Sequence, residues 1–489
     1  MFYNRKRLHA SLGYMSPVAY RMKNMGGGME NNMQEYRIEH DSMGEMKVPA
    51  ERYWGAQTQR SFENFPIGWE KMPREIIRAF AVLKEAAARA NAALRPDKMT
   101  QEKKGAIEKV CEEILEGGLS KEFPLSVWQT GSGTQTNMNV NEVIANRGNE
   151  LLGKKVLHPN DDVNMSQSSN DTYPSAMKMA AAILIHDELL PSVRVLTETF
   201  KRLEKENEGI VTSGRTHLQD AVPVAFSQEI FGWRGMLERD AKQLETALET
   251  LYELAIGGTA VGTGLNAPQG FGDLCSEHIG KITGLPFVSS ENKFHALTSA
   301  DAYVFAHGAL KALAADLMKI ANDIRWLASG PRNGLGEILI PENEPGSSIM
   351  PGKVNPTQCE AITMIAVQVM GNDAAVGMAA SQGNFQLNVF LPVMAYNFLQ
   401  SARLLTDAIL SFEKRCVRGI KANKEKMQEN LNRSLMLVTV LSPVIGYEKA
   451  AEVAKKAHKE GLTLKEAVLK LGYMTEEAFD EVLKPEEMV

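Results

Sequence analysis

The sequence predicts a mostly α-helical protein whose centre is a bundle of long helices. Apolar residues recur at helical spacing over residues 174–206, 224–256 and 299–328, so each of these segments carries an apolar stripe. Strand patterns are few and short. Residues 357–380 and 393–420 are apolar on more than one face, which suits burial between other helices. We therefore expect an oligomer.

The first 32 residues differ in composition from the rest of the chain. They contain no acidic residue before Glu30 and include five cations, Arg5, Lys6, Arg7, Arg21 and Lys23. One interpretation is a transit peptide, but no amphipathic stripe supports it. Residues 1–22 instead resemble the C-terminus of insertion-sequence transposases, without the catalytic acidic residues of that family. We favour a gene-fusion or start-site artefact, with the protein beginning near Met29 or Met33 after a poorly ordered, dispensable extension.

Three further regions are expected along the chain. Residues 33–167 are predicted to form a mixed, mainly helical N-terminal domain, in which one helix starts at Arg74 and Pro96 stops it. Residues 168–424 hold the long helices of a central bundle domain. Residues 425–489 are predicted to form a small helical C-terminal domain. A chain of 489 residues exceeds the usual size of one domain, which agrees with this division.

Composition excludes several classes of function. The net charge is −6 and the pI is about 6.0, so no overall surface suits nucleic acid or a membrane. The longest apolar runs, such as Met179–Ile185, are far shorter than a membrane span. The cysteines lack the CxxC spacing of zinc or iron–sulfur sites, so we predict no metal and a reduced cytoplasmic location; they are Cys111, Cys275, Cys359 and Cys416.

Four polar segments interrupt the helical pattern. They cover Gln129–Val143, His158–Asp171, Ser213–Ala221 and Gly346–Pro356, and each combines Ser, Thr or Asn with neighbouring polar residues. Any one of them alone is explained by a capped turn, because these residue types favour caps and turns. Four such segments between long helices favour a ligand site built from short neutral hydrogen-bond donors.

The segment "GSSIMPGKVNP", residues 346–356, suggests the ligand. Its polar groups are small apart from Lys353, and no Walker lysine motif or GxGxxG after a strand points to a nucleotide. One lysine among neutral donors suits a small anion, most simply a carboxylate. Asn355 and Pro356 have the pattern of a helix N-cap and first helical position, so we expect a helix N-terminus to point at the same anion.

A base is expected among the histidines. His217 lies in the segment "GRTHLQD", beside Arg215 and Thr216, whereas a lone histidine elsewhere in a helix is usually structural. Glu360 follows the loop within a helix that is otherwise poor in charge. Its carboxylate could hold an imidazole in one tautomer, or simply interact with the helix dipole.

These segments resemble the fumarase/aspartase superfamily over nearly the whole chain from residue 35. The motifs "GSGTQTNMN", "QSSNDTYP", "GRTHLQDA" and "MPGKVNPTQCEA" are similar to those of class II fumarate hydratases. Aspartate ammonia-lyases, the alternative, typically have Gln at the position of His217 and Ala at that of Gly352. The resemblance implies a three-domain fold with a central five-helix bundle, joined as a homotetrameric helical core whose active sites each draw on three chains.

The resemblance also implies a role for each matching residue. Ser347 would remove the C3 proton of malate, and His217 paired with Glu360 would handle the hydroxyl or water at C2. The substrate carboxylates and the charged intermediate would be bound by Ser132, Gly133, Thr134, Ser168, Ser169, Asn170, Thr216, Ser348, Lys353, Val354 and Asn355. A second dicarboxylate site would comprise His158, Pro159, Asn160 and Asp161.

The expected reaction is the reversible hydration of fumarate to (S)-malate in the tricarboxylic acid cycle. The resemblance implies no cofactor, and fumarate or malate as the small-molecule partners. One departure from the family pattern is Gln386 in "GNFQLNVF", where the family more commonly has Glu. We expect this change to alter local hydrogen bonding without changing the reaction.

Overall fold

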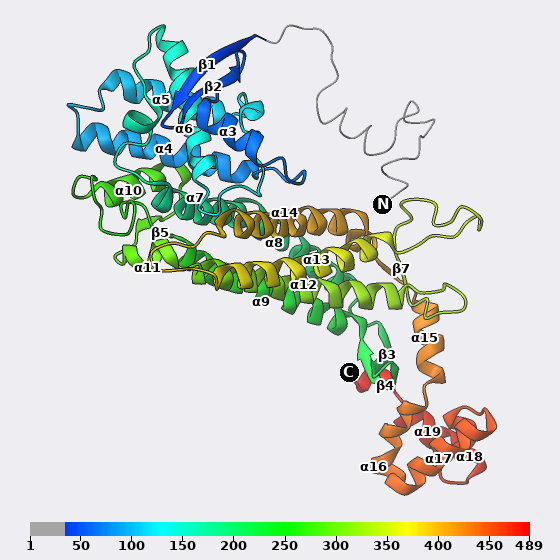
Figure 1. Cartoon of the computed structure of the whole chain (residues 1–489). Helices are drawn as coiled ribbons and strands as arrows, with labels where there is room; N and C mark the ends of the chain where they lie inside the picture. Colours follow the sequence, from blue (N-terminus) through cyan, green and yellow to red (C-terminus); the bar gives the residue numbers. More distant parts are fainter. Residues whose placement is uncertain (1–34) are drawn as a thin grey trace.

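A computed structural model describes residues 35–489, so the predictions for residues 1–32 fall outside the described part of the chain. The first region combines a two-stranded hairpin with several helices (Figure 1). Its elements are β1 (Tyr36–Asp41), β2 (Gly44–Pro49), α3 (Ala56–Asn64), α4 (Arg74–Leu94), α5 (Gln101–Leu115), η2 (Ser120–Glu122), α6 (Thr134–Leu152) and η3 (Pro159–Val163). The helix predicted to start at Arg74 is α4, and it ends before Pro96.

Long helices run side by side through the middle of the molecule. The strongest contacts join α12 to α13, α13 to α14 and α8 to α9. The elements of this region are α7 (Ser169–Leu184), η4 (Ile185–Leu189), α8 (Leu190–Glu206), β3 (Val211–Thr216), β4 (Gln219–Ala225), α9 (Phe226–Leu251), β5 (Glu253–Leu254), α10 (Phe271–Thr283), β6 (Val288–Ser289), α11 (Lys293–Thr298), α12 (Asp301–Leu327), β7 (Ile338–Leu339), α13 (Thr357–Ala380) and α14 (Leu391–Arg415).

Short helices complete the chain and lie at the end of the bundle opposite β1 and β2 (Figure 1). From Leu431 onward they form a hydrophobic cluster of their own, which includes Val453 and Phe479, whereas one larger cluster joins the first region to the bundle. The elements are η5 (Val417–Gly419), β8 (Lys421–Ala422), α15 (Lys424–Arg433), η6 (Leu435–Leu441), α16 (Ser442–Ile445), α17 (Tyr447–Glu460), α18 (Leu464–Lys470), α19 (Glu476–Val482) and η7 (Pro485–Glu487).

The observed helices explain most of the predicted apolar stripes. The helix predicted over residues 357–380 is α13 with the same bounds, whereas the prediction over 224–256 ran too long. The reason is that α9 stops at Leu251, and residues 253–254 pair in parallel with β6. Strands are as few as predicted, since residues 35–489 contain four two-stranded sheets.

Helix α13 presents an apolar surface that nothing in the described chain covers. Met364 and Met378 are each 67 % exposed, and Val367 is 63 % exposed. By length and composition α13 is also the one helix in residues 35–489 that could cross a membrane, although core helices of soluble proteins pass the same test. Large exposed apolar surfaces of this kind mark interaction sites.

Candidate functional site

Two polar segments begin helices at the same end of the bundle. At the start of α6, Gly133 adopts a left-handed backbone with φ 72°, and a Cβ there would lie 2.0 Å from the Tyr173 ring. The Ser132 and Thr134 hydroxyls, on either side of this glycine, lie 3.1 Å apart. Glycine therefore permits the close turn that presents both hydroxyls beside the helix N-terminus.

The start of α7 is held by a reciprocal cap. The Ser168 side chain accepts a hydrogen bond from Asn170 N–H, and Ser168 N–H donates to Asp171 Oδ1 at 2.9 Å. The other carboxylate oxygen of Asp171 accepts from the N–H groups of Gly257 and Thr259. Burial raises the pKa of Asp171 to about 6, against the lowering effect of these donors.

Asn137 joins the two helix starts. Its side-chain amide donates to Ser169 Oγ at 2.9 Å, so the first turn of α6 is connected directly to the first turn of α7. Asn170 is fixed from the other side, because its amide donates to the carbonyl of Ala260 at 2.9 Å. Two helix N-termini with three serines and a threonine form a suitable anion site.

The segment predicted as a second site lies on the surface in η3. His158 Nδ1 accepts from Asp161 N–H at 3.2 Å, and both side chains are more than half exposed. His158 N–H donates to Asp162 Oδ2, and Asp162 forms an ion pair with Lys103. Pro159 and Asn160 continue this single surface turn, so the four predicted residues do lie together.

His217 occupies the tip of the hairpin formed by β3 and β4. His217 and Leu218 have φ angles of 58° and 59°, although neither is glycine or asparagine. A two-residue hairpin turn with both central φ angles positive normally uses those residue types, so this turn carries backbone strain. The imidazole of His217 makes no hydrogen bond within residues 35–489, and it is exposed together with Thr216.

A buried ion pair anchors this hairpin close to its tip. Glu337 is fully buried and accepts two hydrogen bonds from the Arg215 guanidinium, one of them 2.9 Å long. Asn430 of α15 donates to the same carboxylate at 2.7 Å. The position of His217 is thus tied through Arg215 to the segment before β7 and to α15, a connection that the sequence did not predict.

The loop over residues 346–356 closes on itself through its backbone. Gly346 N–H donates to the Lys353 carbonyl at 2.7 Å, and the Asn355 amide donates back to the Gly346 carbonyl at 2.7 Å. The prediction that Asn355 caps the following helix is wrong, because its side chain makes this loop contact and α13 begins after Pro356. Ser347 Oγ accepts N–H bonds from Ile349 and Met350 at 3.3 and 3.1 Å.

The predicted site residues form two groups that are far apart in one chain. Helix α9 has 26 residues and a length of about 39 Å; it starts directly after the hairpin and ends near the loop that caps Asp171. Helix α13 has 24 residues, about 36 Å, and it starts directly after the 346–356 loop. Beyond its far end, Leu391 N–H donates to the Gly131 carbonyl.

The hairpin and the loop therefore lie at one end of the bundle, and the starts of α6 and α7 lie at the other (Figure 1). Glu360, in the first turn of α13, is exposed and makes no hydrogen bond or ion pair with His217 within the described residues. Gln386 lies in the exposed segment between α13 and α14, at the same end as Gly131. One chain alone does not assemble the predicted site.

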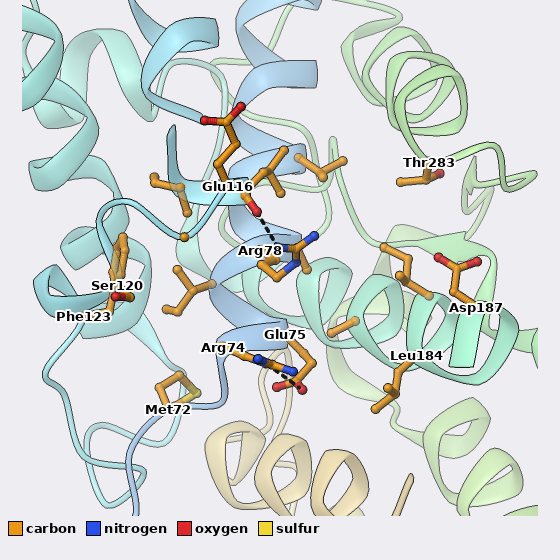
Figure 2. Close-up of a pocket in the computed structure, with 18 of the residues that line it drawn as sticks. Met72, Arg74, Glu75, Arg78, Glu116, Ser120, Phe123, Leu184, Asp187 and Thr283 are labelled. Carbon is orange, nitrogen blue, oxygen red and sulfur yellow. Dashed lines mark hydrogen bonds and ion pairs between the residues drawn. The ribbon is translucent and has the colours of Figure 1, made fainter. Parts of the chain in front are cut away.

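A cavity of about 700 Å³ lies elsewhere, between α4, α5, α7, α10 and α14 (Figure 2). None of the predicted site residues lines it. Several of its charged groups already have partners, since Arg403 contacts Glu75 and Glu188, and Arg78 donates to the Leu115 carbonyl. This cavity is thus separate from the predicted chemistry.

Comparison with known proteins identifies the family. A family model described as "Lyase" matches residues 44–371, and one described as "Fumarase C C-terminus" matches residues 437–489. The class II fumarate hydratases of Bacillus cereus and Helicobacter pylori strain J99 are 62 % and 61 % identical to the chain, each alignment covering 93 % of this chain and 99 % of the relative. The chain belongs to the class II fumarate hydratase family.

Solved structures agree with this assignment to the class II fumarate hydratases, which are hydro-lyases. The crystal structure of class II fumarase from Schistosoma mansoni superimposes with a TM-score of 0.90 at 43 % identity, covering 93 % of this chain and 99 % of that one. The mostly helical fold predicted from the sequence is therefore confirmed. These comparisons give no support to the resemblance of residues 1–22 to a transposase.

Proposed function

We propose that the chain interconverts fumarate and (S)-malate at a site assembled from three segments supplied by different copies. The observation that carries this proposal is the separation of the α6 and α7 starts from the hairpin and the loop by the length of a long helix. Since these groups cannot meet within one chain, a complete site needs at least a second copy, and the family resemblance implies a third. The identity to class II fumarate hydratases supports the reaction.

Ser347 is the proposed base for the C3 proton of malate. A serine hydroxyl is a weak base, so it needs groups that stabilise the alkoxide. Ser347 Oγ already accepts two backbone N–H bonds, from Ile349 and Met350, and Lys353 in the same loop supplies a positive charge. Ser348, Val354 and Asn355 would shape this loop around the substrate.

His217 is the proposed acid for the departing C2 hydroxyl. Proton transfer from its imidazole lets the hydroxyl leave as water while the C3 electrons form the double bond of fumarate. The strained hairpin tip holds the imidazole exposed, where a site on another copy can receive it. We propose that Glu360 of a different copy pairs with His217 in the assembled site, because the two residues make no contact within one chain.

The carboxylates of the substrate would bind at the paired starts of α6 and α7. The positive ends of their helix dipoles and their short hydroxyl side chains suit two anionic groups. The residues proposed for this role are Ser132, Gly133, Thr134, Ser168, Ser169, Asn170 and, from the hairpin, Thr216. The surface turn of His158, Pro159, Asn160 and Asp161 is the proposed second dicarboxylate site.

Assembly into a homotetramer would cover the exposed face of α13. Two methionines and a valine on this face are each more than 60 % exposed, and burying them against another copy is favourable by about 1.5–3 kcal/mol per side chain. We further propose a cytoplasmic location, a role in the tricarboxylic acid cycle, no cofactor, and domain boundaries near residues 167 and 424.

The test follows fumarate by its ultraviolet absorbance. The purified chain is supplied first with (S)-malate and then with aspartate, and His217→Asn serves as the control variant. We expect fumarate to form from malate only, and the variant to be nearly inactive. Fumarate formation from aspartate and not from malate would replace the proposal with an ammonia-lyase.

A further inference from the structure

A buried lysine lies directly behind the starts of α6 and α7. Lys84 is on the apolar face of α4, and its side chain is fully buried. Its ammonium donates three hydrogen bonds, to Asn137 Oδ1 at 2.7 Å, Gln167 Oε1 at 2.9 Å and Asn164 Oδ1 at 3.0 Å. All three acceptors are neutral amides, and no carboxylate contacts Lys84 within the described residues.

This arrangement leaves a positive charge inside the protein without a contacting counter-ion. A buried ammonium is costly even when its donors are satisfied. Three groups face it from the surrounding helices, namely the Asp171 carboxylate of α7 and the thiols of Cys111 and Cys275 on α5 and α10, and the Phe80 ring faces it from α4 itself. Asp171 already accepts three backbone N–H bonds. Burial lowers the pKa of Lys84 to about 7.

Lys84 also sets the direction of the hydrogen bonds that reach Ser169. An ammonium can only donate, so the oxygen of the Asn137 amide must face Lys84 and its nitrogen must face away. That nitrogen donates to Ser169 Oγ at 2.9 Å. The oxygen of Ser169 is then occupied as an acceptor, and its own O–H is left to donate to another group. An anion in front of the α7 start is the matching acceptor.

We propose that Lys84 is a positioning residue for the dicarboxylate: through Asn137 it holds Ser169 as a donor, and its charge favours an anion at the paired starts of α6 and α7. This inference rests on the proposed function of that site. Lys84 does not contact the substrate in this arrangement, so the reaction itself is left to the loop and the hairpin. Its effect falls on binding of the anion, and therefore on KM more than on kcat.

The experiment compares wild type with Lys84→Gln, and uses Lys178→Gln as a matched control. Lys178 is another buried lysine, but its ammonium donates to the Glu253 carbonyl and contacts none of the proposed binding residues. Binding of succinate, an unreactive C4 dicarboxylate, is measured by calorimetry, alongside KM and kcat for malate. Thermal unfolding of each variant reports any purely structural loss.

We expect Lys84→Gln to weaken succinate binding and raise KM about 10- to 100-fold, the range for losing one charge-assisted interaction, with a smaller change in kcat. Lys178→Gln should leave both constants near wild type. Unchanged succinate affinity and KM in a folded Lys84→Gln would overturn the proposal, because a structural role changes only stability. A wild type that binds succinate but does not hydrate fumarate would instead refute the proposed function alone.

A measurement on the wild type remains decisive if Lys84→Gln does not fold. A bound dianion stabilises the ammonium, so succinate affinity should fall as pH rises through the pKa of about 7. Binding just above that pH should also take up protons, which calorimetry detects as a dependence on the ionisation enthalpy of the buffer. Affinity that stays constant across this range, without proton uptake, would contradict a role for the Lys84 charge.

Discussion

Two inactive variants should restore each other's activity if the site is shared between copies. The first variant is Ser347→Ala, which removes the proposed base. The second is the double change of Ser132 and Thr134 to Ala, which removes two hydroxyl donors to a charged group, each contributing about 1.5–3 kcal/mol. In one chain these groups lie at opposite ends of α13, which is about 36 Å long, so they cannot serve the same site.

The two variants are unfolded together in equal amounts, refolded, and assayed with malate. In randomly mixed assemblies a site is intact when the chain that supplies its loop still has Ser347 and the chain that supplies its α6 start still has Ser132 and Thr134. About one site in four meets this condition, so about a quarter of wild-type activity should return. Controls are each variant refolded alone and one chain carrying all three substitutions. No recovery in assemblies verified to be mixed would refute the shared site.

Further predictions concern individual groups. Ser347→Ala should lower kcat for malate about 10²–10⁴-fold while succinate still binds, and Ser348→Ala should be milder; a deeper loss in Ser348→Ala would move the base to that residue. Burial, with repulsion from Asp316, raises the pKa of Asp240 from 3.8 to about 7, so the free energy of unfolding should fall as pH rises across that interval. At 1.36 kcal/mol per pKa unit, Asp240→Asn should therefore increase the free energy of unfolding by as much as about 4 kcal/mol at a pH above 7, and by much less near pH 4. Denaturant unfolding at both pH values measures this difference. Treatment with a chelator should leave malate turnover unchanged, and a loss restored by added metal would contradict a metal-independent site.

The positions of the long helices could be predicted because their signal is local. The stripe of apolar residues along α12 repeats every three or four positions, and burial of that stripe is what stabilises the helix. The end of α9 was predicted less well, because residues 253–254 leave the helix to pair with β6, a contact distant in sequence. Periodicity contains no information about such a partner.

The site residues could be found as types but not placed in space. Serines, threonines and asparagines marked the two segments that contain the starts of α6 and α7, yet nothing local specified that Asn137 donates to Ser169. Lys84 carried a usable signal, since a lysine four residues after Phe80 falls on the apolar face of α4. The role of Asn355 was predicted wrongly because an asparagine before Pro356 suits a helix N-cap. In the structure its side-chain amide instead donates to the Gly346 carbonyl within the loop.

Exposed apolar side chains beside both halves of the site connect assembly with catalysis. Ile349, two residues after Ser347, is 83 % exposed, and Phe385, in the segment that leads to the Gly131 contact, is 93 % exposed. An isolated chain gains nothing from leaving either side chain in water, whereas burial between copies is favourable by about 1.5–3 kcal/mol for each. The same step would exclude water from Ser347 and Lys353, where a lower dielectric strengthens the attraction between the lysine and a developing alkoxide. In the proposed assembly, association of the chains and activation of the base would therefore be two consequences of one burial event, and a dissociated chain would retain the residues of the site without the environment in which they react.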